Sequence, residues 1–160
     1  MALMRYGLDS EFSQLHSVLL YLPGEEIANH PDPPTIQHIA PINYPELARQ
    51  LGAVIDRFSE LGIEVTVIPK PADPADCSNY NMMFCRDLLF MTPAGAIMAS
   101  MAHEIRRKEV AHAARKLLQK GIPILDSISG EGRFEGADAL WINRNLVAVG
   151  VGNRTNLAGY

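Results

Sequence analysis

The feature that most constrains this chain is an internal repeat. The segments FCRDLLFMTPAGAIMAS (84–100) and FEGADALWINRNLVAVG (134–150) each read as Phe, a nearby Asp, an apolar strand, a polar turn and a second strand that ends in small residues. The spacing between the two segments is about 51 residues, near the long end of the range for repeat architectures. Because a repeat unit buries its apolar face mainly against its neighbours, the sequence predicts an array of similar units.

A helix and a returning strand are predicted to complete each unit. Residues 46–62 carry apolar side chains at helical spacing, and a second helix is predicted from about Ala102 to Lys120. Each helix is followed by a glycine in the position of a left-handed cap, Gly62 or Gly121, and then by a short β-rich run at 63–69 or 122–125. With a further buried strand predicted at 17–22, the fold class is α/β, built from ββαβ repeats.

Strand structure is also predicted through most of residues 81–100, divided by the turn at 92–95. On that pattern, strand alternation points Cys85 away from Phe84 and Arg86, as a structural thiol.

After residues 150–156 the repeat predicts one more helix and strand, whereas the sequence ends at Tyr160. We therefore expect about two and a half units, with residues 1–160 as the N-terminal part of a single domain in a longer protein. A stop codon directly after Tyr160 would favour a free-standing module instead.

Composition excludes several classes of protein. The 160 residues are 48% hydrophobic and 20% charged, as in ordinary globular domains. A net charge of −4 without a dense Lys/Arg cluster predicts no nucleic-acid partner. No apolar run approaches the roughly 20 residues of a membrane-spanning helix, and the first residues lack a signal peptide's apolar region, so we expect a cytoplasmic protein without a membrane partner. Cys77 and Cys85 are predicted to be reduced thiols, and no metal site is expected.

Acidic side chains recur at nearly equivalent places in the two repeats. Asp87 and Glu135 each come just before a hairpin, and Asp138 is a third candidate for the same place. In a radial array these carboxylates would face a common centre, where they repel one another unless a cation lies between them. A planar guanidinium fits best, because it donates paired N–H···O bonds. The pattern predicts a site for a guanidinium group.

Basic and polar residues extend this site. Arg106 and Arg154 match in repeat position, and two arginines near a cavity suit a bidentately bound carboxylate. Asn81 could add an amide contact, and Phe84 an aromatic wall over the flat cation. A ligand with a cationic head and a carboxylate tail is arginine or a derivative of it.

Structural roles are the alternative for each of these residues. The Arg86–Asp87 pair is typical of an ion pair at a strand edge, and Asp138 could brace its hairpin. Arg106 could belong to a solvated helix face and Arg154 could cap a loop, while an isolated Phe such as Phe84 is most often part of a core.

Three motifs resemble those of a known superfamily. N-x-x-F-x-R-D (81–87), F-E-G-A-D (134–138) and G-x-x-x-R-T (150–155) look like the motifs of guanidino-group modifying enzymes. These include arginine deiminases, dimethylarginine dimethylaminohydrolases and amidinotransferases. The opening SEFSQLHSVLLYLPGEEI resembles the N-terminus of arginine deiminases. The resemblance implies a pentein fold, an α/β propeller of five ββαβ-type units with the substrate in its central channel.

The resemblance also implies roles for individual residues. Asp87 and Glu135 would be catalytic and hold the substrate guanidinium, while Asn81, Arg106 and Arg154 would bind its α-carboxylate. In the family a cysteine thiolate attacks the guanidinium carbon, water hydrolyses the thiouronium intermediate, and a histidine transfers protons. Neither cysteine of this chain stands at the nucleophile's position and no His follows Glu135. The C-terminal units that carry the catalytic Cys and His would thus be absent, and the 160 residues alone are predicted to be inactive.

The function implied first is that of an arginine deiminase-type hydrolase, which converts L-arginine to L-citrulline and ammonia. A dimethylarginine hydrolase or an amidinotransferase is the alternative within the superfamily. A non-catalytic pentein that serves as a binding or assembly module is the alternative from another class. No metal or organic cofactor is implied, and the exposed edges of an incomplete fold predict self-association.

Overall fold

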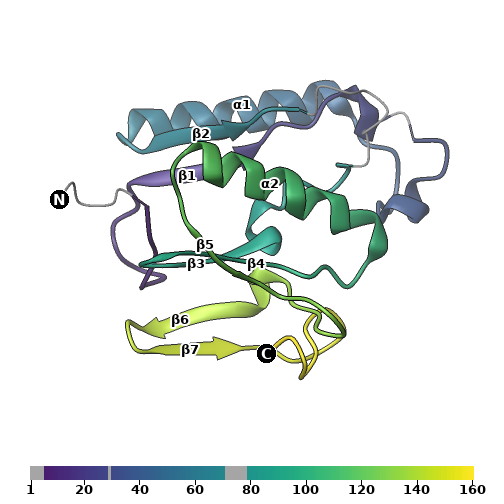
Figure 1. Cartoon of the computed structure of the whole chain (residues 1–160). Coiled ribbons are helices and arrows are strands. Elements are labelled where there is room, and N and C mark those ends of the chain that lie inside the picture. The colour runs from purple at the N-terminus through teal and green to yellow at the C-terminus, as the bar shows by residue number, and fades with distance from the viewer. Residues whose placement is uncertain (1–5, 29, 71–78) are drawn as a thin grey trace. The chain divides into compact units, whose positions relative to one another are not determined.

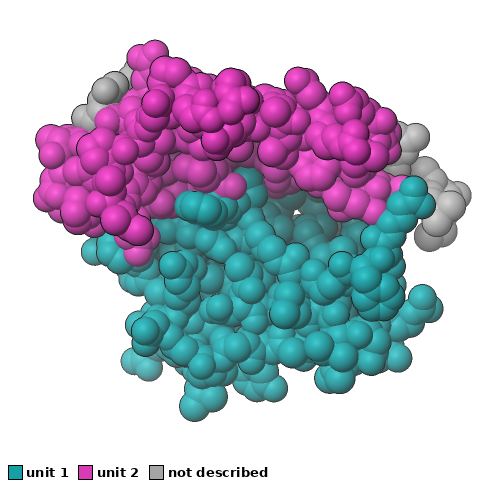
Figure 2. All heavy atoms as spheres, turned by 180° about the vertical axis from the view of Figure 1, so that it is seen from behind, with its two compact units in different colours: residues 1–14, 84–160 teal, residues 15–83 magenta. Residues whose placement is uncertain are grey.

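The computed structural model describes residues 6–28, 30–70 and 79–160. The chain contains both helices and strands, which confirms a mixed α/β fold (Figure 1). The chain divides into two compact units, residues 15–83 and residues 84–160 with the N-terminal stretch up to Gln14 (Figure 2).

The unit of residues 15–83 contains a parallel pair of strands. β1 (Ser17–Tyr21) pairs with β2 (Glu64–Ile68) in the register that places Ser17 opposite Glu64. Parallel strands need a long connection, and here α1 (Tyr44–Glu60) supplies it after two short 3₁₀ turns, η1 (Glu25–Ile27) and η2 (Pro33–Ile36). Asn43 caps α1, since its side chain accepts a hydrogen bond from the Glu46 amide at 3.2 Å.

The second unit contains a three-stranded sheet, one helix and a separate hairpin. β3 (Leu89–Thr92) and β4 (Gly95–Met98) pair antiparallel, and β5 (Ile124–Ser127) joins β4 in parallel. Between β4 and β5 the chain forms the 3₁₀ turn η5 (Glu104–Arg106) and then α2 (Arg107–Gln119). The antiparallel hairpin of β6 (Ala139–Asn143) and β7 (Leu146–Val149) follows.

Both long helices end in the predicted way. Gly62 and Gly121 have φ angles of 73° and 74°, in the left-handed region that glycine tolerates. The amide after each glycine closes the same bond, from Ile63 to the Phe58 carbonyl and from Ile122 to the Leu117 carbonyl. This shared Schellman geometry confirms that the two helix-to-strand connections are equivalent.

The two hairpins of the second unit pack on each other closely. Two 3₁₀ turns introduce them, η4 (Cys85–Leu88) before β3 and η6 (Gly136–Asp138) before β6. A Cβ added at Gly136 would collide with the carbonyl oxygens of Arg86 and Leu89, so only glycine lets η6 approach this closely. Trp141 stacks on Phe90 with ring centroids 5.4 Å apart.

Some predicted boundaries are wrong. The segment before β3 is the 3₁₀ turn η4 instead of a strand, because the Asp87 amide donates to the Phe84 carbonyl at 3.1 Å. The alternation argument for Cys85 therefore does not apply. The helix expected from Ala102 begins at Arg107, after η5, and the strand expected at 122–125 lies at 124–127. No helix in the described part of the chain is long and apolar enough to cross a membrane.

Candidate active site

Two equivalent turns place the predicted catalytic carboxylates. Asp87 lies within η4, and Glu135 is the residue directly before η6. Because Gly136 brings η6 against the backbone of η4, the two acidic residues are held on neighbouring turns. The Glu135 side chain is 3% exposed and the Asp87 side chain is 16% exposed, so neither carboxylate is fully hydrated. Each therefore needs a cationic partner.

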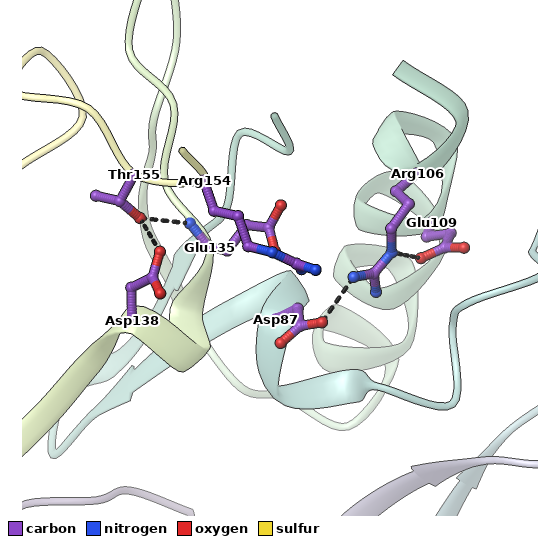
Figure 3. Close-up of polar contacts among 7 residues, drawn as sticks. All are labelled: Asp87, Arg106, Glu109, Glu135, Asp138, Arg154 and Thr155. Carbon is purple, nitrogen blue, oxygen red and sulfur yellow. Dashed lines mark hydrogen bonds and ion pairs between the residues drawn. The ribbon is translucent and has the colours of Figure 1, made fainter. Parts of the chain in front are cut away.

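Arg106 is the partner of Asp87. Its Nη1 lies 2.6 Å from Asp87 Oδ2, and its Nε donates to Glu109 Oε2 at 2.9 Å (Figure 3). The Arg106 side chain is only 3% exposed and that of Glu109 only 1%. The start of α2 thus buries a guanidinium between two carboxylates. The predicted contact of Arg106 with a ligand carboxylate stays a prediction, and the contacts observed are with protein carboxylates.

Arg154 is the partner of Glu135, and it is far more exposed. Its Nη1 lies 2.6 Å from Glu135 Oε2, while 56% of its side chain is accessible to solvent. The hydrogen bond and charge of Glu135 raise the pKa of Arg154 above its ordinary value, and the charges of Asp87 and Asp138 act in the same direction. The Arg154 guanidinium therefore lies in the combined field of three carboxylates, and Figure 3 shows its side chain extending across Glu135.

Asp138 and Thr155 brace this arrangement. The Thr155 hydroxyl donates to Asp138 Oδ2 at 2.6 Å and accepts a hydrogen bond from the Glu135 amide at 3.1 Å. The Asp138 amide in turn donates to the Glu135 carbonyl at 2.9 Å. The observed contacts of Asp138 are those of the bracing role, while its predicted role in substrate binding stays a prediction.

Phe84 and Asn81 belong to different compact units of the chain. Phe84 precedes η4, and 54% of it is exposed, so its ring is not part of the core. Asn81 belongs to the unit of residues 15–83, where it is buried and its side-chain amide donates to the Ile36 carbonyl at 2.8 Å. The predicted substrate contacts of both residues stay predictions.

Arg86, the other charge of the F-x-R-D motif, has structural contacts. Its guanidinium donates to Glu11 Oε1 at 2.9 Å and to the Ala139 carbonyl at 3.1 Å, which links η4 to the start of β6. Glu11 also accepts from the Trp141 amide. Partial burial raises the pKa of Glu11, but the Arg86 and Trp141 hydrogen bonds and the Arg86 charge together hold this pKa below its ordinary value. Asp87 is thus the charge of this motif that pairs with Arg106 and acts on Arg154.

Two residues of the site were not predicted, Glu109 and Thr155. Both are fully buried polar residues, a feature that the sequence does not display. A signal for the arginine partners was present, since each arginine follows its carboxylate by 19 residues, from Asp87 to Arg106 and from Glu135 to Arg154. Equal spacing in two repeats indicates equal pairing. Among the described residues, no group of three or more His, Cys, Asp or Glu side chains could hold a metal ion.

Comparison with known proteins identifies the family. The model of the arginine deiminase family matches residues 77–160, just over half of the chain. The chain therefore belongs to the arginine deiminase family, and the predicted resemblance to guanidino-group modifying enzymes is confirmed. A comparison with curated protein sequences gives no significant match.

Solved structures show that the fold is shared with known proteins. Dimethylarginine dimethylaminohydrolase from Pseudomonas aeruginosa, a mutant complexed with citrulline, matches with a TM-score of 0.73 and 19% identity, over 91% of this chain and 54% of that chain. The N-terminal domain of ArgZ bound to product, an arginine dihydrolase from cyanobacteria, matches with a TM-score of 0.72 and 18% identity, over 90% of this chain and 51% of that chain. The chain thus spans about half the length of each of these two structures.

Proposed function

We propose that this chain supplies the guanidinium-binding part of an arginine deiminase-type hydrolase, which converts L-arginine to L-citrulline and ammonia. The observation that carries the proposal is the pairing of carboxylates on successive repeats, Asp87 and Glu135, with guanidinium groups at 2.6 Å. These carboxylates are negatively charged and largely buried, so they favour a planar cation. A substrate with a guanidinium group meets this requirement. The arginine deiminase family match supports this choice of substrate.

The proposed architecture is the N-terminal two and a half ββαβ units of a single pentein domain, with residues 1–160 as its first part. This architecture is supported by the length of the two solved structures, since the chain spans about half of each. It is also supported by the exposed apolar surface of the β6–β7 hairpin, where Leu140, Ile142 and Leu146 are 48–53% exposed. A helix in the position that α2 has in the preceding repeat would cover these side chains.

The proposed reaction requires a nucleophile and a proton carrier from the remaining units. A cysteine thiolate adds to the guanidinium carbon, ammonia leaves with a proton from a histidine, and water then cleaves the carbon–sulfur bond to release citrulline. Asp87 and Glu135 hold the guanidinium nitrogens during both steps. Their negative charges keep the substrate cationic, and a cationic carbon centre is the better electrophile for a thiolate.

The test is citrulline release from arginine by the full-length protein. We expect Asp87→Ala and Glu135→Ala each to abolish turnover, because each removes one acceptor for the guanidinium nitrogens. Asp56→Ala is the matched control, since Asp56 is an exposed aspartate of α1, in the other unit. Full turnover in both site variants would refute the assignment of these carboxylates.

A further inference from the structure

A cavity lies beside α2, in the unit that contains residues 84–160. It has a volume of about 380 Å³ and is formed by one face of α2, by the end of β4 with the residues after it, and by β5. Figure 1 shows α2 next to the sheet of β3, β4 and β5. The volume falls in the range of about 300 to 1,000 Å³ that is typical of small-molecule sites. Asp87 and Glu135 do not line this cavity, so it is separate from the proposed guanidinium site.

The interior of the cavity is mainly apolar. Met98 and Met101 line it and are only 2% and 1% exposed, so they form a buried floor. On the side of α2, Val110, Ala111 and Ala114 line it, at the spacing of one helix face. The two alanines leave space that longer side chains on this face would fill. Because methionine side chains adapt to the shape of the group that they contact, this floor suits an apolar ligand group.

Arg107 supplies the charge of the cavity. Among the described residues that line the cavity, Arg107 alone is charged. Its side chain is 61% exposed, and its ion pair with Glu104 is long, at 3.9 Å, with a partner that is 89% exposed. Such an ion pair contributes little to stability. The adjacent Arg106, by contrast, is 3% exposed and bound between Asp87 and Glu109. The Arg107 guanidinium is therefore the one that an anionic ligand can engage without disrupting the buried charge cluster.

We propose that this cavity binds a small carboxylate with an apolar tail, with the carboxylate paired to Arg107 and the tail placed against Met98 and Met101. An arginine binds a carboxylate through two parallel N–H···O bonds, and burial of the tail adds affinity. Ser100 and Ser127 also line the cavity, and their hydroxyl groups are further donors for carboxylate oxygens. A cation would be repelled by Arg107, and a small polar anion would leave the apolar floor in contact with water.

NMR titration of protein labelled at the methionine methyl groups tests the proposal. Sodium hexanoate is the probe, and 1-hexanol, which has a similar tail without the carboxylate, is the comparison. We expect hexanoate to shift the methyl signals of Met98 and Met101 in a saturable way and to leave the signal of Met82 unchanged. Met82 is also fully buried, but it belongs to the other compact unit.

Three variants show which contacts hold the ligand. Arg107→Met should weaken the binding of hexanoate about fivefold to tenfold, because a charge-assisted bond at an exposed position is lost, and should leave the affinity for 1-hexanol unchanged. Lys108→Met is the matched control, since Lys108 is the next exposed cation of α2 but does not line the cavity, and it should change neither affinity. Ala111→Phe should fill part of the cavity and weaken the binding of both compounds.

Three results would overturn the proposal. If hexanoate does not shift the signals of Met98 and Met101, the cavity is not a site for such carboxylates. If Arg107→Met and Lys108→Met weaken hexanoate binding alike, Arg107 does not hold the carboxylate. If Arg107→Met weakens 1-hexanol binding as much as hexanoate binding, the preference for a carboxylate is wrong. Unchanged circular dichroism spectra establish that the variants are folded, and citrulline release tests the guanidinium site separately.

Discussion

Replacing Arg106 by methionine tests the role of the buried charge cluster. The substitution keeps much of the side-chain volume but removes the guanidinium that lies 2.6 Å from Asp87 and 2.9 Å from Glu109. Because Glu109 is 1% exposed, its charge cannot be compensated by water. Removal of one partner from a buried ion pair costs about 3 to 5 kcal/mol. Since domains of this size are stable by about 5 to 15 kcal/mol, a large part of the free energy of unfolding should be lost.

Urea denaturation followed by circular dichroism measures this loss. The control is Arg107→Met at the adjacent position, where the side chain is 61% exposed and lies 3.9 Å from a carboxylate oxygen of Glu104. The control should change the free energy of unfolding by at most about 0.5 kcal/mol. Adding Glu109→Gln to Arg106→Met should recover about 1 kcal/mol or more, because it removes the buried charge. Equal losses in Arg106→Met and Arg107→Met, or strictly additive effects in the double variant, would show that no buried charge depends on Arg106.

Two further predictions concern the contacts that hold the hairpins. The pKa of Glu11 is lowered in the folded state, below its ordinary value of 4.5. The ion pair of Glu11 with Arg86 therefore stabilises the protein above pH 4.5, and this stabilisation is lost as the pH falls through the lowered pKa. Glu11→Gln should reduce the melting temperature at pH 7, with a deficit that shrinks at acid pH, whereas the exposed Glu131→Gln should show no such trend. Gly136→Ala should destabilise the protein by about 3 kcal/mol through overpacking against the neighbouring turn. Gly152→Ala is the control, because Gly152 has open space around it, and it should leave the urea midpoint nearly unchanged. Similar midpoints for the two variants would contradict the close packing at Gly136.

Much of the fold could be predicted because local chemistry decides it. The glycines at 62 and 121 and the apolar spacing before them are sufficient to end two helices and start two strands. The turn η4 could not be predicted in this way, since Cys85–Leu88 is flanked by apolar residues that are typical of strands. Its 3₁₀ conformation lets the carbonyls of Arg86 and Leu89 meet the backbone of Gly136, a tertiary contact that local propensity does not encode.

The sequence indicated which residues are candidates for the site, but not how their side chains pair. Repeat position alone brought Asp87 and Glu135 together as candidates, since equivalent residues of adjacent units face the same direction. The partners of Arg106 and Arg154 depend on which side chains are buried, and burial is a property of the packed structure. For example, the sequence does not indicate that Arg106 is only 3% exposed and bound to Glu109. Both features depend on the packing of α2 against η4, which is a tertiary contact.

A crystal structure of the protein with arginine bound would show which side chains hold the ligand's guanidinium group. We expect guanidinium nitrogens of the ligand within about 3 Å of carboxylate oxygens of both Asp87 and Glu135. Arginine bound elsewhere, without contact to either carboxylate, would contradict the proposed site.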